Sequence, residues 1–462
     1  MSGACDGDPS GSPPSGDGTE QEALQGFPRT VFLGRRERVL DALGGGAMVL
    51  PAAPPLIRSV DATLRYRPSS ELFYLTGLTD PGALLVLRGF ADGNRSVLFA
   101  RSRNAKAEAW SGLRTDPEEV GRRTGVDEVR PAGRIRDHLG ALLAGADRIF
   151  FRLGTDPTVE ARVRHALEVA RLRGARHGTG PRGVLDPGLI LDDLRLRKDA
   201  SEIQAIRGAV DITATALRTA VAHLRPGIGE WELEAELEAG FRRLGAAGPA
   251  FASIVGSGAN GCVLHYVENS RRMQAGDLVL IDAGAESRMY AGDISRTFPV
   301  SGSFSPEQAD LYQLVDAARR AAIRKVRPGT AVSEIHEAAV ATLTEGLHQL
   351  GVAEGNGDRG ADSGVHERFF PHQTSHWLGI DVHDVGDYAT NGVARRLEEG
   401  MVLTVEPGLY FGPGTPAGPF EGIGIRIEDD VLVTGDGVEV LSAALPTGLD
   451  DVAALVGRAP DG

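Results

Sequence analysis

Short apolar runs alternate with amphipathic helical patterns in the first part of the chain. We predict strands at Ala83–Leu87, Val97–Ala100 and Arg148–Arg152, because each is a short run rich in apolar residues. An amphipathic helix is predicted at Val159–Leu172. This alternation indicates an α/β domain over residues 27–194, in which no catalytic cluster is visible.

From about residue 195 onward the helical patterns are longer and the strands are β-branched. Asp199 and Glu202 form a capping box, and Ser305 and Ser333 mark two further helix starts. We expect the first two of these helices to stop at Pro-Gly pairs. Segregated long helices and antiparallel strands indicate an α+β domain over residues 195–462. Its predicted strands are Leu278–Ile281, Met401–Val405 and Ile423–Ile427.

The charge balance excludes two classes of partner. The 462 residues carry 49 Lys and Arg against 63 Asp and Glu, which gives a net charge of −14 with histidine neutral. General binders of nucleic acid or of anionic membranes need clustered basic surface, so we expect neither partner. No uninterrupted apolar stretch of about 18 residues occurs, so no transmembrane helix is expected.

The first residues and the cysteine count bear on the compartment. Residues 1–26 hold five acids, no bases and no apolar run, which is typical of a disordered acidic tail and not of a signal peptide. Cys5 and Cys262 are too few for a disulfide framework or a zinc-finger cluster. We therefore expect a reducing, cytoplasmic setting.

Four carboxylates of the second domain occupy positions where burial is predicted. Asp282 ends the apolar run Leu278–Ile281, and Asp293 follows it after a polar turn. If that turn is centred between Ser287 and Arg288, the two aspartates face each other on neighbouring strands. Like charges in such a place repel, so a cation must lie between them.

Glu406 and Glu428 form a second pair of this kind. Glu406 closes the strand Met401–Val405, and Glu428 shares a strand face with Arg426, opposite the neighbouring isoleucines. Two hairpins that each offer two carboxylates could enclose two divalent cations. Any one of these acids could instead be a strand end paired with an arginine, but the four together favour a metal site.

Histidine supplies a further type of metal ligand. Seven of the eleven histidines fall between His265 and His383, and His372, His376 and His383 lie close together in the sequence. The zinc motif HExxH is absent, because His336 and Glu337 are not followed by a second histidine at the required spacing.

Six ordered motifs resemble a known family. They are Gly256–Tyr266, Asp282–Gly284 with Tyr290–Phe298, Ser375–Gly379, Asp381–Gly386, Val405–Gly408 and Ile425–Glu428. Together they resemble aminopeptidase P, the Xaa-Pro aminopeptidase family of metallopeptidases with the pita-bread (creatinase/aminopeptidase-like) fold. The resemblance covers the second domain and extends more loosely into the first through Arg65–Gly77.

The resemblance implies five metal ligands and two divalent metal ions. Asp282 would bind one metal, Asp293 and Glu428 would bridge both, and His376 and Glu406 would complete the second. All the donors are oxygen or imidazole, which suits Mn²⁺ better than a soft-ligand metal. Two such ions can hold a hydroxide between them and polarise the scissile carbonyl.

The resemblance also implies roles for residues around the metals. Glu406 would pass a proton to the leaving proline nitrogen, which is a poor leaving group when unprotonated. His265 and His383 would contact the substrate carbonyl and the oxyanion, and His372 would hold the proline side. Arg426 would orient a neighbouring carboxylate or the substrate. Each histidine could instead be a core residue satisfied by hydrogen bonds.

The implied activity is removal of the N-terminal residue from peptides whose second residue is proline. The nearest alternative is an Xaa-Pro dipeptidase, although Ser375–Trp377 and Asn260–Cys262 resemble the aminopeptidase branch more. A metal-free binding protein that kept the fold is the third possibility. The resemblance further implies a homo-oligomer, a dimer or a tetramer, in which Trp110 lines the substrate pocket of a neighbour.

Two other hypotheses fail on the sequence itself. Gly256, Gly258 and Gly261 match the spacing of a dinucleotide fingerprint, but a β-branched stretch follows them where a helix is required. Cys262 and His265 could indicate a thiol nucleophile. Nothing electropositive nearby would lower the pKa of the thiol, so we expect a buried, inert cysteine.

Overall fold

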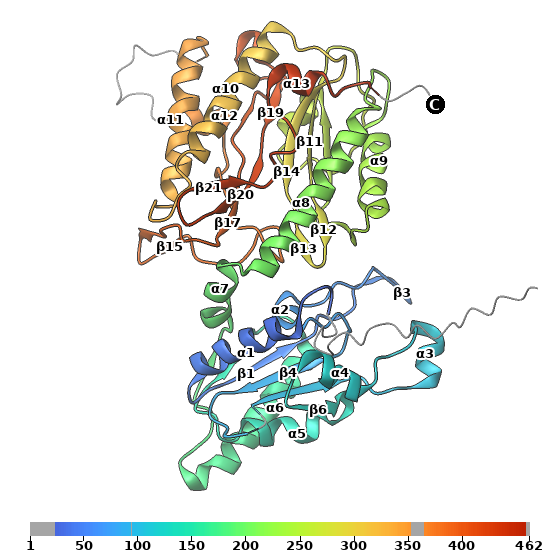
Figure 1. Ribbon diagram of the computed structural model, residues 1–462, viewed down its shortest axis with the longest axis vertical. Coiled ribbons are helices and arrows are strands. Elements are labelled where there is room, and N and C mark those ends of the chain that lie inside the picture. Colours follow the sequence, from blue (N-terminus) through green and yellow to red (C-terminus); the bar gives the residue numbers. More distant parts are fainter. Residues whose placement is uncertain (1–23, 94, 353–364, 459–462) are drawn as a thin grey trace, which may run out of the picture. The chain divides into compact units, whose positions relative to one another are not determined.

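The computed structural model describes residues 24–93, 95–352 and 365–458 of the chain. The chain divides into two compact units, residues 1–186 and residues 187–462 (Figure 1). The predicted acidic tail lies outside the described residues up to position 23. Leu24, within the predicted tail, is buried and pairs with Phe27 through two backbone hydrogen bonds.

The first unit is built on one mixed six-stranded sheet. Its order is β6 (Glu128–Pro131), β5 (Ser96–Ala100), β4 (Leu84–Arg88), β1 (Ala47–Pro51), β7 (Ile149–Phe150) and β8 (Val184–Leu185). The β1–β4 and β4–β5 pairs are antiparallel, and the remaining pairs are parallel. The predicted strands at residues 83–87 and 97–100 are confirmed, whereas the predicted strand at residues 148–152 is only two residues long.

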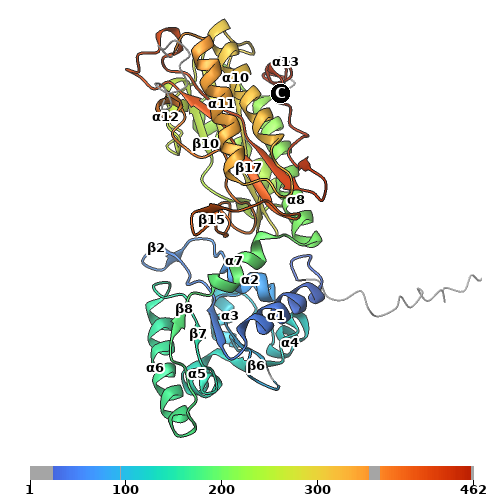
Figure 2. The ribbon, with the colours of Figure 1, turned by 90° about the vertical axis from the view of Figure 1, so that its left-hand side faces the viewer.

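Six helices accompany this sheet in the described part of the first unit. They are α1 (Arg29–Leu43), α2 (Ser70–Thr76), α3 (Ala105–Ser111), α4 (Pro117–Thr124), α5 (Ile135–Leu143) and α6 (Pro157–Gly174). Figure 2 shows α5 and α6 lying beside each other, and their apolar faces form one core with β1, β4, β5 and β7. This arrangement confirms the predicted α/β class and the helix at residues 159–172. A short hairpin, β2 (Ile57–Ser59) and β3 (Ala62–Thr63), is exposed.

The described part of the second unit contains four helices of 14 to 22 residues and three shorter ones. They are α7 (Gly188–Leu196), α8 (Ala200–Val221), α9 (Glu230–Arg243), α10 (Pro306–Ile323), α11 (Ser333–Gln349), α12 (Val365–Phe369) and α13 (Leu449–Ala453). The predicted capping box of Asp199 and Glu202 is present at the start of α8. The expected stops at Pro226 and Pro328 are both wrong, because α8 ends at Val221 and α10 at Ile323. Each helix ends in a tight turn, with backbone bonds from Leu224 to Val221 and from Val326 to Ile323.

The strands of the second unit form a layer between two helix pairs, α8 with α9 and α10 with α11 (Figure 1). Its sheets are β10-β11-β14, β13-β12-β9, β17-β20-β21, β18-β19 and β15-β16. The strands are β9 (Gly248–Pro249), β10 (Ile254–Ser257), β11 (Leu278–Ala283), β12 (Ala285–Ser287), β13 (Tyr290–Ala291), β14 (Ile294–Pro299), β15 (Ala389–Thr390), β16 (Val393–Ala394), β17 (Val402–Val405), β18 (Gly408–Tyr410), β19 (Gly424–Arg426), β20 (Asp429–Val433) and β21 (Val438–Val440). The predicted α+β class is confirmed.

Among the described residues, the helices are too short or too polar to cross a lipid bilayer.

The start of α8 offers a test of the capping interaction. The Asp199 carboxylate accepts hydrogen bonds from the backbone N–H groups of Ser201 and Glu202. Asp199→Ala leaves these groups unpaired, and we expect the free energy of unfolding of the second unit to fall by about 1 kcal/mol. Urea unfolding of the full chain measures this, with Asp199→Ser as the matched variant that keeps a capping oxygen. Equal midpoints for the Ala and Ser variants would contradict the assignment.

Candidate active site

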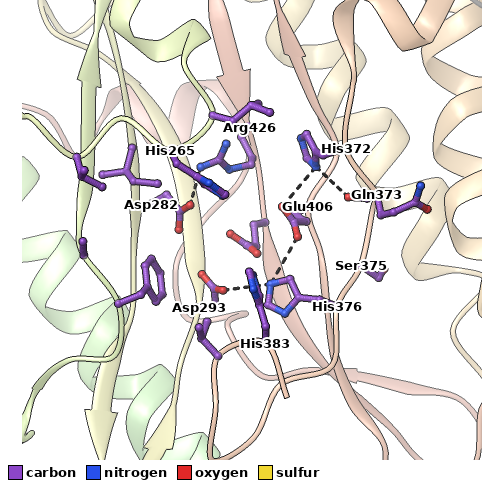
Figure 3. Close-up of a pocket in the computed structure, with 17 residues that line it drawn as sticks. His265, Asp282, Asp293, His372, Gln373, Ser375, His376, His383, Glu406 and Arg426 are labelled. Carbon is purple, nitrogen blue, oxygen red and sulfur yellow. Dashed lines mark hydrogen bonds and ion pairs between the residues drawn. The ribbon is translucent and has the colours of Figure 1, made fainter. Parts of the chain in front are cut away.

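A cavity of about 490 Å³ lies in the second unit and is lined by both polar and apolar side chains (Figure 3). All nine residues that the sequence predicts as ligands or catalytic groups line it: His265, Asp282, Asp293, His372, His376, His383, Glu406, Arg426 and Glu428. The apolar part of the lining consists of Phe251, Ala252, Ile254, Leu264, Val267 and Val382. The structure therefore brings together residues that are up to 163 positions apart in the sequence.

The first pair of carboxylates comes from the β11–β14 ladder. Asp282 pairs with Ser295 and not with Asp293, so the expectation that the two aspartates face each other directly is wrong. The reason is the turn, which is formed by Arg288 and Met289 and has φ values of +53° and +73°. A turn with two positive φ values is usually marked by Gly or Asn, and neither is present here. Asp293 consequently lies diagonal to Asp282.

The second pair comes from two ladders that share one register. Val405 pairs with Asp429 between β17 and β20, and Gly408 pairs with Arg426 between β18 and β19. Counting along these ladders places Glu406 opposite Glu428, at the point where regular pairing is interrupted. The backbone N–H of Glu428 bonds to the Ser295 carbonyl on β14. Both pairs of carboxylates therefore meet in one cavity.

The hydrogen bonds of His376 leave one ring nitrogen free for a metal. Its Nδ1 donates to the Trp377 carbonyl oxygen over 3.1 Å, since a carbonyl can only accept. The Nε2 atom lies 3.4 Å from Asp293 Oδ2 and 3.5 Å from Glu406 Oε1. Burial lowers the pKa of His376 to about 4, so the ring is neutral, as a metal ligand must be.

Arg426 is the cation that contacts the carboxylates directly. Its Nη2 donates to Asp282 Oδ2 over 2.5 Å, and its Nη1 donates to the Tyr410 hydroxyl over 3.0 Å. Its Nε donates to Ser295 Oγ over 2.9 Å, and that hydroxyl donates to Glu428 Oε2 over 2.7 Å. Arg426 thus orients Asp282 directly and Glu428 through Ser295.

His372 continues this network on the other side of Tyr410. The Tyr410 hydroxyl donates to His372 Nε2 over 2.8 Å, while Nδ1 donates to the Gln373 carbonyl over 2.9 Å. Burial, with the charge of Arg426, lowers the pKa of His372 to about 3. His372 is therefore a neutral ring with both nitrogens already bonded. Ser295 and Tyr410 belong to the site but carry no motif signal in the sequence beyond their closeness to Asp293 and Glu406.

The carboxylates are short of positive charge. Burial raises the pKa of Asp293 well above its usual range, and the charges of Glu428 and Asp282 raise it further. Burial and the charge of Glu406 act in the same way on the pKa of Glu428. Burial raises the pKa of Glu406 to about 8, although Arg426 opposes this. Four acids therefore share a cavity whose lining contains a single arginine.

Two buried oxygen atoms indicate where cations belong. Asp282 Oδ1 and Asp293 Oδ1 are buried and make no hydrogen bond with any described residue. Asp293, His376 and Glu428 each offer a ligand atom, and these atoms lie within 4.8 Å of one another. Oxygen and imidazole donors without thiolate suit hard or borderline divalent cations. The residues present therefore fit a divalent metal centre.

His265 and His383 flank the carboxylates on two loops (Figure 3). The rings of His383 and His376 lie edge to face, with centroids 4.4 Å apart. The loop of His383 is anchored by buried Asp384, which accepts from Lys198 Nζ over 2.9 Å and from Arg195 Nη2 over 2.5 Å. His265 is exposed and follows the 3₁₀ turn Gly258–Cys262.

The structure also argues against the dinucleotide site and the thiol nucleophile that were considered from the sequence. The three glycines of the fingerprint spacing lead into a 3₁₀ turn, not into a helix that could bind a pyrophosphate. Gly258 has a φ of +55°, and a Cβ on Gly256 would lie 3.0 Å from the Asn260 backbone, so the local backbone geometry explains these two glycines. Burial raises the pKa of the Cys262 thiol to about 12, which makes it inert.

Comparison with known proteins agrees with this geometry. Residues 204–435 match the metallopeptidase family M24, and residues 32–150 match the aminopeptidase P N-terminal domain. The Xaa-Pro aminopeptidase of Escherichia coli (strain K12) is 41% identical over 431 residues, which cover 93% of this chain and 98% of that protein. The chain belongs to metallopeptidase family M24. As an M24 metallopeptidase it has the pita-bread catalytic domain that the sequence motifs imply.

Solved structures extend the similarity to M24 enzymes in three dimensions. The aminopeptidase PepP of Pseudomonas aeruginosa has a TM-score of 0.89 at 42% identity and covers 93% of this chain and 98% of its own. A zinc-substituted Escherichia coli aminopeptidase P in complex with product has a TM-score of 0.88 at 41% identity, with the same coverage. Both the family and the donor set support divalent metal ions in this chain.

Substitution of Asp293, a buried candidate ligand, should separate stability from metal binding. Asp293→Asn removes one of the repelling charges, so we expect the melting temperature of the EDTA-treated protein to rise by roughly 2–4 °C, equivalent to about 1 kcal/mol. The same variant should lose the stabilisation that added Mn²⁺ gives the wild type, because a ligand is lost. Thermal unfolding with EDTA and then with excess Mn²⁺ measures both effects.

Asp310→Asn is the matched control, because Asp310 is an exposed acid on α10. It should change neither the EDTA melting temperature nor the response to Mn²⁺. A wild-type response to Mn²⁺ in Asp293→Asn would show that Asp293 is no ligand.

Proposed function

We propose that this protein is a dinuclear-metal aminopeptidase that hydrolyses the bond between an N-terminal residue and a penultimate proline. One observation carries the proposal: carboxylates, histidines and Arg426 from six separate motifs converge on one cavity. They do so in a chain that resembles an Xaa-Pro aminopeptidase over nearly its whole length. The partners are peptides with proline at position 2.

We assign the metal ligands as follows. Asp282, Asp293, His376, Glu406 and Glu428 would together hold two divalent ions. The unpartnered Oδ1 atoms of both aspartates and the free Nε2 of His376 support this assignment. Two bound ions would supply a water of lowered pKa and would polarise the carbonyl. We propose Mn²⁺, because no thiolate is present.

In this proposal Glu406 moves the proton. Its Oε1 lies 3.5 Å from His376 Nε2, and its Oε2 lies 3.7 Å from His372 Nδ1, so the carboxylate spans from the metal ligands to the His372 side of the cavity. It takes a proton from the attacking water and delivers it to the proline nitrogen. The secondary amine can then leave in neutral form.

The remaining residues orient the peptide. His265 and His383 lie on the cavity rim, where each can donate a hydrogen bond to the scissile carbonyl oxygen and to the oxyanion that develops from it. Both nitrogens of His372 are already bonded, so its ring contacts the proline side by packing. Arg426 holds Asp282 in place.

We also propose a homo-oligomer, a dimer or a tetramer. Trp110 on α3 is 89% exposed, and no residue of that helix is buried. A tryptophan so exposed in the single chain supports a place in the substrate pocket of a neighbouring copy. The two cysteines of the sequence are consistent with a reducing, cytoplasmic compartment.

Substrate length tests the function. Full-length protein with Mn²⁺ should release the N-terminal residue from an Xaa-Pro-Yaa tripeptide, and EDTA should abolish this activity until Mn²⁺ is restored. Chromatography of the products alongside metal analysis measures both. Hydrolysis of the Xaa-Pro dipeptide alone would show a dipeptidase instead. Absence of both bound metal and hydrolysis would indicate a binding protein that lost the chemistry.

The role of His383 can be tested separately from metal binding. His383→Ala should lower kcat by about 10²–10³-fold, since a donor to the oxyanion is lost. Metal content should stay unchanged, because the ring is not a ligand. Steady-state kinetics with metal analysis decides this, and His165→Ala, an exposed histidine on α6, is the control. An equal loss of metal and activity would make His383 a ligand.

A further inference from the structure

A buried carboxylate outside the cavity lining binds five donors. Glu230, the first residue of α9, is 0% exposed. Its Oε1 accepts from Ser257 N over 2.7 Å, from Ser257 Oγ over 2.7 Å and from Asn260 Nδ2 over 3.2 Å. Its Oε2 accepts from the Tyr266 hydroxyl over 2.9 Å and from Arg271 N over 2.8 Å. Both oxygens are therefore fully engaged, since a carboxylate has about four accepting positions.

All five donors lie in one segment, residues 257–271, which carries His265. Ser257 ends β10, Asn260 lies in the 3₁₀ turn, and Tyr266 directly follows His265. The Glu230 backbone N–H also donates to the Arg271 carbonyl over 3.0 Å. One glutamate therefore ties the beginning, the middle and the end of the segment to a single point on α9.

His265 has no comparable support of its own. Its side chain is exposed and makes no hydrogen bond or ion pair with the described residues. The nearby Val263 and Val267 are 54% and 51% exposed, so few side chains pack around His265 on either side. Cys262, Leu264 and Tyr266 pack inward, against the small cluster of Ile254, Leu280 and Tyr410, while His265 itself does not. The position of His265 therefore depends on the backbone of the segment.

The negative charge of the Glu230 carboxylate contributes to these contacts as well as its geometry. Arg271 donates to Ser257 Oγ over 2.7 Å and pairs with Asp277 over 2.5 Å, which places a guanidinium beside the buried carboxylate. A glutamine at position 230 would turn an NH₂ group toward N–H and O–H donors, because an amide has only one accepting atom. One end of the segment would then lose its partner.

We propose that Glu230 is a positioning residue for the peptidase reaction: by binding residues 257–271 it holds His265 against the scissile carbonyl. The proposal rests on the proposed function and on the contact between His265 and substrate. Glu230 itself touches no reacting atom. Loss of its contacts should displace His265 while leaving the metal ligands, which lie on other strands, in place.

The experiment is a double-mutant cycle on the full-length, Mn²⁺-loaded protein with an Xaa-Pro-Yaa tripeptide. We expect Glu230→Gln to lower kcat/KM by about 10²-fold, the loss typical of a small misplacement of a reacting group, with metal stoichiometry unchanged. In the His265→Ala background the same substitution should have little further effect. Glu236→Gln, an exposed acid on the same helix, should match the wild type.

A milder variant covers the case in which Glu230→Gln does not fold. Tyr266→Phe removes one hydroxyl donor, and it should lower kcat/KM by a smaller factor that also vanishes in the His265→Ala background. Losses that multiply with that of His265→Ala would overturn the proposal, as would wild-type kcat/KM in Glu230→Gln. Failure of the proposed function itself would be visible separately, as absence of tripeptide hydrolysis by the metal-loaded wild type.

Discussion

Mutual repulsion among buried carboxylates is the constraint around which the second unit is organised. Glu428 and Asp429 are adjacent and both buried, yet only Asp429 is neutralised by the protein itself, through Arg296 and Arg319. Those two arginines hold the pKa of Asp429 below its usual range despite its burial. Glu428 instead accepts a hydrogen bond from the uncharged hydroxyl of Ser295. The chain thus balances a structural acid internally, whereas the neighbouring carboxylate is available to the divalent cation that we propose.

The strands are arranged to maintain that imbalance. Two ladders hold the acids in fixed register, and hydrogen bonds from Arg426 and Ser295 fix the direction of the side chains. Fixed tautomers of His372 and His376 complete the cavity. A site held in this way needs little rearrangement when a cation or a peptide binds, because most of the ordering entropy is already lost on folding.

Much of this arrangement could be predicted from the sequence, and the rest has clear physical reasons for escaping it. A carboxylate at the end of an apolar strand is a local signal, which is why Asp282 and Glu406 stand out. The register of Asp293 was not predictable, because the Arg288–Met289 turn adopts positive φ without glycine or asparagine. Tyr410 and Glu230 act through partners that are distant in the sequence. The periodicity of apolar and polar residues does not reveal such long-range contacts.

The shared register of Glu406 and Glu428 determines which part of this chain can vary in length during evolution. The segment between β18 and β19 is closed at its base by hydrogen bonds between Phe411 and both Ile423 and Gly422. The ladders on either side, and not this connection, set where the two acids stand. Residues 412–421 can therefore gain or lose length without moving a carboxylate, so this connection is free to diversify while the chemistry of the cavity stays constant.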